Sequence, residues 1–429
     1  MTRLLNVDEA RMQVLAQAAP LPLRSVPLAE ALGCVLGEDV VSDIDSPPHD
    51  KSVVDGYAVR SADLAAGIAE LLVVEELTAG MVPRQAVGPG QAARIMTGAP
   101  IPAGADAVVM VEKTDGGGRV GLPVSIRGGP VRAGQNIMRR AASLARGQKV
   151  LAAGRRLRAI ECGLLAEVGR GTVQVIPQPC VAVLATGNEL VPHTAVPGPG
   201  QIRNSNGPLL EGLIREAGAT VGLAASAADD KAALRAAIER GLTHDVLLIS
   251  GGVSAGVLDL VPATLAELGV REVFHKVNIK PGKPLWFGVW HPSETTHRCL
   301  VFGLPGNPVS TLVSFLLFVR PALAALAGRK NGGLPQWKGH LTQSFRQHGD
   351  RPTYWPVTLS GCASTPGSGT ASPGLAVAPL AWKGSGDLAT LSQAQGLAVF
   401  PAGDCEFEPG SEVTVIAFSS AAGEPADFE

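Results

Sequence analysis

The stretch HDVLLISGGVSAG, His244–Gly256, is the clearest indication of the fold in the central part of the chain. Its four consecutive apolar residues, Val246–Ile249, predict a strand that is buried on both faces, as the strands of a parallel sheet are. The turn that follows is mostly glycine, which lets a phosphate approach the main chain and receive hydrogen bonds from its amides. The stretch therefore predicts either a turn that uses glycine for steric reasons or a binding site for a phosphorylated ligand.

The residues around this stretch alternate between strands and helices. We expect buried strands at 181–186, 221–226, 246–250 and 299–304. Helices with leucine or isoleucine at three- and four-residue spacing are expected at 208–218, 230–241 and 259–269. This order is typical of a doubly wound, mostly parallel sheet covered by helices on both faces. The sequence thus predicts an α/β domain over residues 177–328.

The flanking segments have the composition of smaller β-rich domains. Short apolar runs separated by turns such as DGGG and RGGPVRAG predict a β-rich domain inserted at 51–143. After residue 335, runs such as GLAVFPAG and EVTVIAF predict a C-terminal β-barrel over 335–429, with STPGSGTASPG at 364–374 as an exposed loop. A length of 429 residues fits several domains. We expect a multidomain α/β plus β protein.

Charge is nearly balanced over the whole chain but not along it. The net charge of −2 gives no general reason to expect nucleic acid or an anionic membrane as a partner. Residues 116–160, however, contain no acidic residue and ten basic ones: Arg119, Arg127, Arg132, Arg139, Arg140, Arg146, Lys149, Arg155, Arg156 and Arg158. This run predicts either a solvated basic face or a surface that receives an anion.

Cysteine usage and hydropathy favour a cytoplasmic protein. The 6 cysteines lie far apart without a C-x-x-C pair, which indicates neither a disulfide framework nor a zinc ribbon and fits a reducing cytosol. The N-terminal segment has helical spacing and lacks the apolar core of a signal peptide. The most apolar stretch, residues 309–328, contains Arg320 and Pro321 and is expected to be a buried helix instead of a membrane span.

Three polar loops follow predicted strands of the α/β domain. Ligands of open α/β sheets bind beyond the carboxyl ends of the strands. The first loop, ATGNEL, carries Thr186 and Glu189; the second contains Gly251 and Gly252; and the third, GLPGNPVS, carries Asn307 at the start of a helix. The sequence has neither G-x-G-x-x-G nor G-x-x-x-x-G-K-[ST], which disfavours nicotinamide binding and P-loop hydrolysis. Three loops at one sheet edge predict a shared ligand site.

A cationic turn lies between the second and third loops. In HKVNIKPGKPLWFG, residues 275–288, Lys276, Lys280 and Lys283 surround a Pro-Gly turn. Prolines on both sides of Gly282 stiffen the turn, so two ammonium groups held close together would suit a small dianion. The alternative is an ordinary solvated turn.

Several acidic residues accompany these loops. Asp55, Asp229, Asp230 and Asp259 could each cap a helix or a turn. Gathered near phosphate loops, they could instead hold a Mg²⁺ ion that bridges phosphate oxygens. The residues alone leave both possibilities open.

These stretches, in this order, resemble the MoeA family of molybdopterin molybdenumtransferases, which includes the gephyrin E domain. The matching text is SVVDGYAVR, RIMTGAPIPAGADAVVMVE, GQNIMRR, ATGNEL, ISGGVSAG, IKPGKP and GLPGNPVS, from near residue 40 to about 320. The segment GSGDLATLSQAQGLAVFPAG continues the match weakly into the C-terminal domain. The combination of RIMTGAPIPAGADAVVM with LPGNPVS is highly specific to this family.

The resemblance implies a Mg²⁺-dependent enzyme that inserts molybdate into adenylylated molybdopterin and releases AMP. It further implies a cytoplasmic homodimer whose active site is shared between subunits. An adenylyltransferase would act upstream, and a molybdoenzyme or its chaperone would receive the cofactor. Residues 1–50 and 144–176 would together form a discontinuous N-terminal linker and dimerisation domain.

The resemblance also assigns roles to individual residues. Gly251, Gly252 and Ser254 would line the phosphate and nucleotide pocket together with Thr186 and Asn307. Acidic functional positions would be Asp55, Glu189, Asp229 and Asp259, with Asp259 beside the metal. The molybdate site would consist of Lys280, Lys283, Pro284, Arg351 and Ser385. Thr97 would act with Asp55 from the partner subunit, and Arg139 would meet the pterin phosphate.

The chain departs from the family pattern at three places. It has Ser52-Val53-Val54-Asp55-Gly56 where S-A-M-D-G is usual, which keeps the acid but changes the packing before it. Ala141-Ala142-Ser143 replaces a usual Gly-Glu-Asp, and Val257 stands where an acidic residue is common. Carboxylates are therefore missing at Ala142, Ser143 and Val257, which could weaken metal binding or alter turnover.

Two other functions are consistent with the sequence. A divergent, non-catalytic paralogue would keep the pterin and nucleotide pocket without turnover, as the missing carboxylates could permit. A molybdopterin adenylyltransferase would resemble the α/β domain alone, but the flanking domains and the lysine turn disfavour it. Molybdate insertion is the hypothesis that uses all of the motifs.

Overall fold

The computed structural model describes residues 4–67, 69–115, 118–127, 129–252, 260–292, 297–330, 332–361 and 375–418. The chain forms two compact units. Unit 1 comprises Met1–Arg24, Gly33–Val35 and Val175–Glu429, and unit 2 comprises Ser25–Leu32 and Leu36–Gln174. Each unit has a hydrophobic core of its own.

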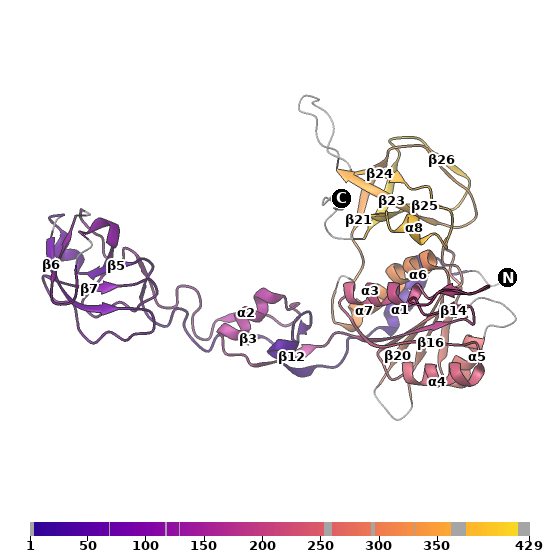
Figure 1. The fold of residues 1–429 in the computed structure, drawn as a ribbon, viewed down its shortest axis with the longest axis horizontal. Helices are drawn as coiled ribbons and strands as arrows, with labels where there is room; N and C mark the ends of the chain where they lie inside the picture. The colour runs from indigo at the N-terminus through magenta and orange to yellow at the C-terminus, as the bar shows by residue number, and fades with distance from the viewer. Residues whose placement is uncertain are drawn as a thin grey trace. The chain divides into compact units, whose positions relative to one another are not determined.

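A six-stranded sheet forms the centre of unit 1 (Figure 1), with the strand order β16–β13–β17–β20–β19–β18. Its strands are β13 (Cys180–Thr186), β16 (Thr220–Ala227), β17 (Val246–Ser250), β18 (Arg271–His275), β19 (Trp286–Trp290) and β20 (Cys299–Leu304). The four strands expected from the sequence pair in parallel, β13 with β16 and β17, and β17 with β20. The mostly parallel sheet is therefore confirmed.

Two strands at one edge of the sheet were not predicted from the sequence. β19 pairs antiparallel with β20, and β18 pairs antiparallel with β19. The lysine turn is the connection of the β18–β19 hairpin, so the cationic residues are carried by an edge of the central sheet. Trp286 and Phe287, directly after the turn, are buried in the core on opposite faces of the sheet.

Helices cover both faces of the sheet. Successive side chains of a strand point to opposite faces, and along β17 Val246 and Leu248 pack in one core cluster whereas Leu247 and Ile249 pack in another. The first cluster includes residues of α3 (Asn206–Glu216). The second includes residues of α4 (Lys231–Gly241) and α5 (Leu260–Glu267). The doubly wound arrangement in Figure 1 follows from this alternation.

The most apolar stretch of the chain is an interior helix of unit 1. Pro308–Leu326 is long and apolar enough to cross a membrane by length and composition alone. It consists of α6 (Pro308–Ser314), a π-helical segment η4 (Phe315–Val319) and α7 (Arg320–Leu326). Phe315, Phe318 and Leu323 have no exposed surface and lie in the same core cluster as the sheet. The expected buried helix is thus confirmed.

The N-terminal helix α1 (Val7–Gln17) belongs to unit 1. A capping box fixes its start, because Asn6 Oδ1 accepts from the amide of Glu9 and the Glu9 carboxylate accepts from the amide of Asn6. Ala10 and Val14 on its buried face join the core around α6 and α7.

The C-terminal part of unit 1 contains a closed β-barrel, as expected. Its strands follow the order β21–β24–β23–β25–β27. They are β21 (Gln336–Leu341), β23 (Thr353–Gly361), β24 (Leu375–Pro379), β25 (Gly396–Phe400) and β27 (Glu412–Ala417), and a separate pair is formed by β22 (Phe345–Gln347) and β26 (Cys405–Phe407). Val357, Val377 and Val415 fill the barrel, whereas Leu397 and Ile416 belong to the core of the α/β domain. The expected loop at 364–374 lies outside the described residues.

Unit 2 is built around a five-stranded sheet with the order β8–β5–β7–β6–β9. The strands are β5 (Gly56–Val59), β6 (Ala69–Leu77), β7 (Gln91–Ile95), β8 (Ala107–Met110) and β9 (Pro123–Ile126). Tyr57 and Val59 face one core cluster and Ala58 the other. The unit also contains the short pairs β4 (Lys51–Ser52) with β10 (Ile137–Met138) and β3 (Val40–Val41) with β11 (Lys149–Leu151), and the helix α2 (Ala159–Glu167). A three-stranded sheet with the order β1–β12–β2 joins β1 (Arg24–Pro27), β12 (Thr172–Ile176) and β2 (Val35–Leu36).

Candidate functional site

A cavity of about 540 Å³ lies beyond the carboxyl ends of the parallel strands in unit 1. Strand register brings these ends to one level, because Ala185 pairs with Ser250 and Ser250 pairs with Leu304. All three predicted loops contribute to its wall. The lining comprises Ala185, Thr186, Gly187, Glu189, Leu190, Ile202, Arg203, Asn204, Ser205, Asn206, Asp229, Ser250, Gly251, Gly252, Pro284, Pro305, Gly306, Asn307, Pro308 and Gly386.

The turn after β17 requires glycine at two positions. Gly251 has φ of +96°, and a Cβ atom there would lie 2.5 Å from the carbonyl oxygen of Thr186. Gly252 has φ of +64°, and a Cβ atom would lie 2.8 Å from Val261 Cγ2. The amide of Gly251 donates to Leu304 O at 3.1 Å, so this amide is occupied by the neighbouring strand end. The steric explanation therefore holds for Gly251, while both glycines line the cavity.

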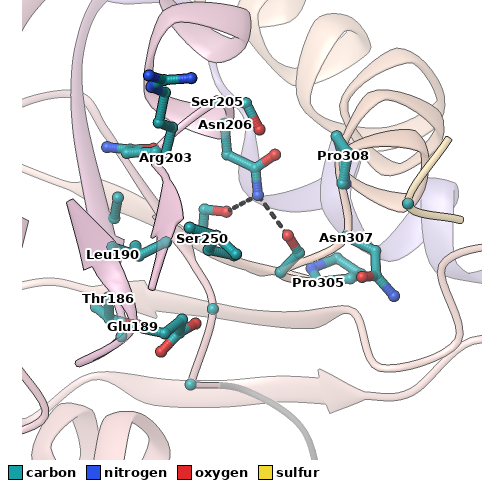
Figure 2. Close-up of a pocket in the computed structure, with 18 of the residues that line it drawn as sticks. Thr186, Glu189, Leu190, Arg203, Ser205, Asn206, Ser250, Pro305, Asn307 and Pro308 are labelled. Atoms are coloured by element: carbon teal, nitrogen blue, oxygen red, sulfur yellow. Dashed lines mark hydrogen bonds between the residues drawn. The ribbon is translucent and has the colours of Figure 1, made fainter. Parts of the chain in front are cut away.

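Asn206 and Ser250 join the strand ends beneath the cavity (Figure 2). Asn206 Nδ2 donates to Ser250 Oγ and to Gly306 O, each at 2.7 Å. These two residues were missed in the sequence, where Ser250 is only the last residue of an apolar strand and Asn206 only precedes a helix. No local signal reveals the pair, because the bonds of Asn206 reach across 44 and 100 residues of chain.

Two of the predicted acids lie at the cavity. Glu189 and Asp229 both line it. Asp229 is held by a reciprocal pair of bonds, with Asn188 N donating to Asp229 Oδ2 at 3.3 Å and Asp229 N donating to Asn188 Oδ1 at 3.0 Å. Asp230 instead caps α4, its carboxylate accepting from the amides of Ala232 and Ala233. Ser254, Val257 and Asp259 lie outside the described residues.

The lysine turn reaches the same cavity through Pro284. Lys280 is half-buried and Lys283 is exposed, and neither belongs to the lining of this cavity as the described residues define it. The barrel supports the turn, because Lys280 N donates to Pro352 O at 2.9 Å and Tyr354 N donates to Lys280 O at 2.8 Å. Arg351 Nη1 donates to Ile279 O at 3.2 Å. The structure therefore brings Arg351 beside the lysine turn, from a different domain.

A second contribution of the barrel domain lies at the third loop. Asn307 Nδ2 donates to Ser385 Oγ at 2.9 Å, and the amide of Val309 donates to Ser385 O at 3.1 Å. Gly386, the next residue, lines the cavity. Ser385 and Asn307 are thus direct neighbours although 78 residues separate them in sequence.

Asp55 and Thr97 form a pair in unit 2. The Thr97 amide and hydroxyl both donate to Asp55 Oδ1, at 2.7 and 2.8 Å. These two hydrogen bonds hold the pKa of Asp55 below its usual range. The pairing follows from the sheet, because Asp55 directly precedes β5 and Thr97 closely follows β7, which is antiparallel to β5.

Arg139 directly follows β10, whose residues Ile137 and Met138 pair antiparallel with Ser52 and Lys51 of β4. Arg139 Nη1 forms an ion pair with Asp50 Oδ2 at 2.6 Å. The basic run around it is partly balanced within unit 2, because Arg140, Lys149, Arg155 and Arg158 also pair with acids that lie outside the run. Half of the ten basic residues therefore have structural partners.

The fold and the cavity define a class of protein: an open α/β domain with a cavity at its strand ends, accompanied by a β-rich unit and a C-terminal barrel. Three family models match the chain. They are described as the MoeA N-terminal region (domain I and II) at residues 5–169, a probable molybdopterin binding domain at 182–325, and the MoeA C-terminal region (domain IV) at 338–418.

Similar proteins carry the same family name. A molybdopterin molybdenumtransferase from Staphylococcus aureus is 33% identical, over 97% of this chain and 96% of that protein. Another from Synechococcus elongatus is 38% identical, over 83% and 88% of the two chains. A crystal structure of a molybdopterin biosynthesis MoeA protein from Pyrococcus horikoshii has a TM-score of 0.71 at 29% identity, covering 97% of this chain and 100% of that one. The chain belongs to the MoeA family.

Proposed function

We propose that the protein inserts molybdate into adenylylated molybdopterin and releases AMP, forming the molybdenum cofactor. Membership of the MoeA family gives it a role in molybdenum cofactor biosynthesis as an enzyme. One observation carries the more specific reaction: the Gly251–Gly252 turn, the lysine turn at Pro284 and the Asn307 loop all border one cavity. A ligand there could contact a nucleotide site and an oxyanion site at once.

The chemistry of these groups supports the assignment. Molybdate is a compact dianion, and Lys280, Lys283 and Arg351 carry three positive charges on adjoining segments. The nucleotide half of the substrate would occupy the side of the cavity that Gly251 and Gly252 line. Preorganised charged donors such as the lysines and Arg351 stabilise negative charge that develops in the transition state.

We propose Mg²⁺ as the cofactor of this reaction. Mg²⁺ prefers oxygen ligands and commonly takes one or two carboxylates, with water and substrate phosphates completing its shell. Glu189 and Asp229 supply two carboxylates to the cavity wall, so the donor set fits the ion. When bound, Mg²⁺ would neutralise charge on the diphosphate. Asp259 remains a proposed metal residue.

The direct test is an AMP-release assay. The folded protein is incubated with adenylylated molybdopterin, Mg²⁺ and either molybdate or tungstate. We expect AMP and molybdenum cofactor to form together, and chelation of divalent cations to abolish AMP release. Release of no AMP above background by the folded protein would refute the proposal.

Substitution of the lysine turn tests the oxyanion site. Lys280→Ala removes a charged donor, and charge-assisted hydrogen bonds contribute about 1.5–3 kcal/mol. We expect the molybdate concentration at half-maximal AMP release to rise about tenfold or more. Lys338→Ala, which removes an exposed lysine paired with Glu412 in the barrel, should leave it unchanged. Equal molybdate requirements in wild type and Lys280→Ala would exclude this lysine from the site.

A non-catalytic binding protein is the second candidate. It is favoured by Ala142 and Ser143, which stand where family members carry carboxylates. Calorimetry that detects tight AMP or pterin binding, together with no AMP release in the assay above, would support this function.

We further propose a cytoplasmic homodimer in which Asp55 and Thr97 serve the cavity of the other subunit. The proposal rests on the family resemblance and on the Asp55–Thr97 pair, which gives the acid a defined orientation. Light scattering of the purified protein should give twice the 44.0 kDa chain mass. A monomer would exclude a site shared between subunits.

A further inference from the structure

The orientation of the Asn206 side-chain amide is determined by its surroundings. Asn206 is 8% exposed and begins α3. Its terminal atom lies 2.7 Å from Gly306 O, and a carbonyl oxygen only accepts, so this terminal atom must be the nitrogen. The second hydrogen of the same NH₂ group then points at Ser250 Oγ, also at 2.7 Å. Figure 2 shows both bonds leaving one nitrogen.

This geometry determines the role of the Ser250 hydroxyl. A hydroxyl has one hydrogen to donate and two acceptor lone pairs. Because Asn206 occupies an acceptor position of Ser250 Oγ, the hydroxyl hydrogen must point elsewhere. Among the described residues, the bond from Asn206 is the one hydrogen bond of Ser250 Oγ, so the hydroxyl hydrogen has no acceptor there. Ser250 lines the cavity beside Gly251, so its hydrogen is available to a ligand.

A phosphate at the end of β17 needs a hydrogen-bond donor. The amide of Gly251 cannot be that donor, because it already donates to Leu304 O. A buried polar hydrogen without an acceptor is unfavourable, whereas an anionic oxygen placed opposite it gains a charge-assisted bond. A phosphate oxygen at the end of β17 would meet this requirement.

We infer that Ser250 is a further substrate-binding residue whose hydroxyl donates to a phosphate oxygen of the bound nucleotide, and that Asn206 is the positioning residue that orients it. This inference rests on the proposed nucleotide site of the same cavity. Asn206 also ties the end of β17 to the Gly306 loop, so the donor and both loops are held in one arrangement.

Binding of AMP to the full chain, measured by isothermal titration calorimetry, tests the inference without requiring turnover. Ser250→Ala should weaken AMP binding about tenfold or more, the effect of losing a hydrogen bond to a charged group. Ser250→Thr keeps a hydroxyl and should stay within about threefold of wild type. Asn206→Ala should weaken binding, and the Ser250→Ala/Asn206→Ala double variant should bind AMP more tightly than the product of the two single losses predicts, because the two residues share one bond.

Ser42→Ala is the matched control. Ser42 is 2% exposed against 3% for Ser250, its hydroxyl is also hydrogen-bonded, and it lies in unit 2. The Ser42→Ala variant should have a lower unfolding temperature, as the Ser250→Ala variant should, but it should bind AMP with wild-type affinity. Wild-type affinity in Ser250→Ala, or losses that multiply in the double variant, would overturn the inference. Failure of the wild-type chain to bind AMP would instead overturn the proposed nucleotide site and this inference with it.

Discussion

Ala141 adopts a backbone conformation that disfavours alanine. Its φ is +60°, in the left-handed region, where a residue with a Cβ atom costs about 1–2 kcal/mol. Ala141→Gly removes this cost. It also adds conformational entropy to the unfolded chain, which cancels about 0.4–1 kcal/mol of the gain in stability. We expect a net stabilisation of up to about 1 kcal/mol, measured as a higher urea midpoint for unit 2.

Ala142→Gly is the control for this prediction. The φ of Ala142 is not positive, so glycine adds unfolded-state entropy there without relieving any strain. We expect it to lower the urea midpoint. Destabilisation of similar size by both substitutions would show that Ala141 carries no strain.

The site residues that could be predicted from the sequence are those whose role depends on their own residue type and their immediate neighbours in the chain. Gly251 and Gly252 could be recognised because their positive φ excludes other residues, and the Lys280 turn because its prolines mark it. Ser250 and Asn206 could not be recognised. Their importance arises from bonds between segments far apart in the chain, which become apparent only when the strand ends are placed side by side.

The start of helix α2 depends on one buried carboxylate. Glu161 is 3% exposed and accepts hydrogen bonds from Arg158 and Arg155, at 2.7 Å each. These bonds, with that of Arg158 the stronger influence, hold the pKa of Glu161 far below its usual 4.5, although burial opposes the shift. The folded state therefore holds the ionised form more strongly than the unfolded chain does.

This shift predicts how the stability of unit 2 depends on pH. The contribution of Glu161 is complete above pH 4.5, the ordinary value for the unfolded chain, and is lost progressively as the pH falls below it, because only the unfolded state then takes up the proton. Glu161→Gln should lower the unfolding temperature by a few degrees at pH 7. The difference from wild type should shrink between pH 4.5 and more acidic values, as calorimetry would record.

Glu412→Gln provides the comparison. Glu412 pairs with Lys338 on the surface of the barrel, with a side chain 57% exposed, and exposed pairs contribute little. We expect the unfolding temperature of the Glu412→Gln variant at pH 7 to be the same as that of wild type. A pH-independent difference between Glu161→Gln and wild type would contradict the explanation.

Among the elements, hydrophobic periodicity in the sequence predicted those strands and helices in which the pattern of burial repeats along the whole element. The strands at β13, β17 and β20 and the helices at α3, α4 and α5 were predicted because burial repeats along each of them. β18 and β19 were missed, because REVFH alternates weakly and WFGVW directly follows a turn that the lysines dominate. Their burial depends on pairing with β20 at the edge of the sheet, which no local pattern reports.

At the scale of the whole molecule, the two units carry different spectroscopic probes. All 5 tryptophans, Trp286, Trp290, Trp337, Trp355 and Trp382, belong to unit 1, and unit 2 contains none. Within unit 1, the α/β domain and the barrel share a core, since Tyr354, Leu397 and Ile416 pack in the same cluster as the central sheet. Tryptophan fluorescence therefore reports the unfolding of one cooperative body.

We expect calorimetry of the full chain to resolve two transitions, of which tryptophan fluorescence follows only one. Each unit has a separate core, so each has its own free energy of unfolding, whereas the shared core makes the barrel and the α/β domain melt together. AMP should raise the fluorescence-detected transition, because a ligand stabilises the state that binds it by RT ln(1 + [L]/Kd). Every residue that lines the cavity belongs to unit 1, so the transition without a fluorescence change should move less. A shift of that second transition alone would locate the nucleotide site in unit 2, where the described residues provide the Asp55–Thr97 pair and Arg139 instead of the glycine-rich cavity.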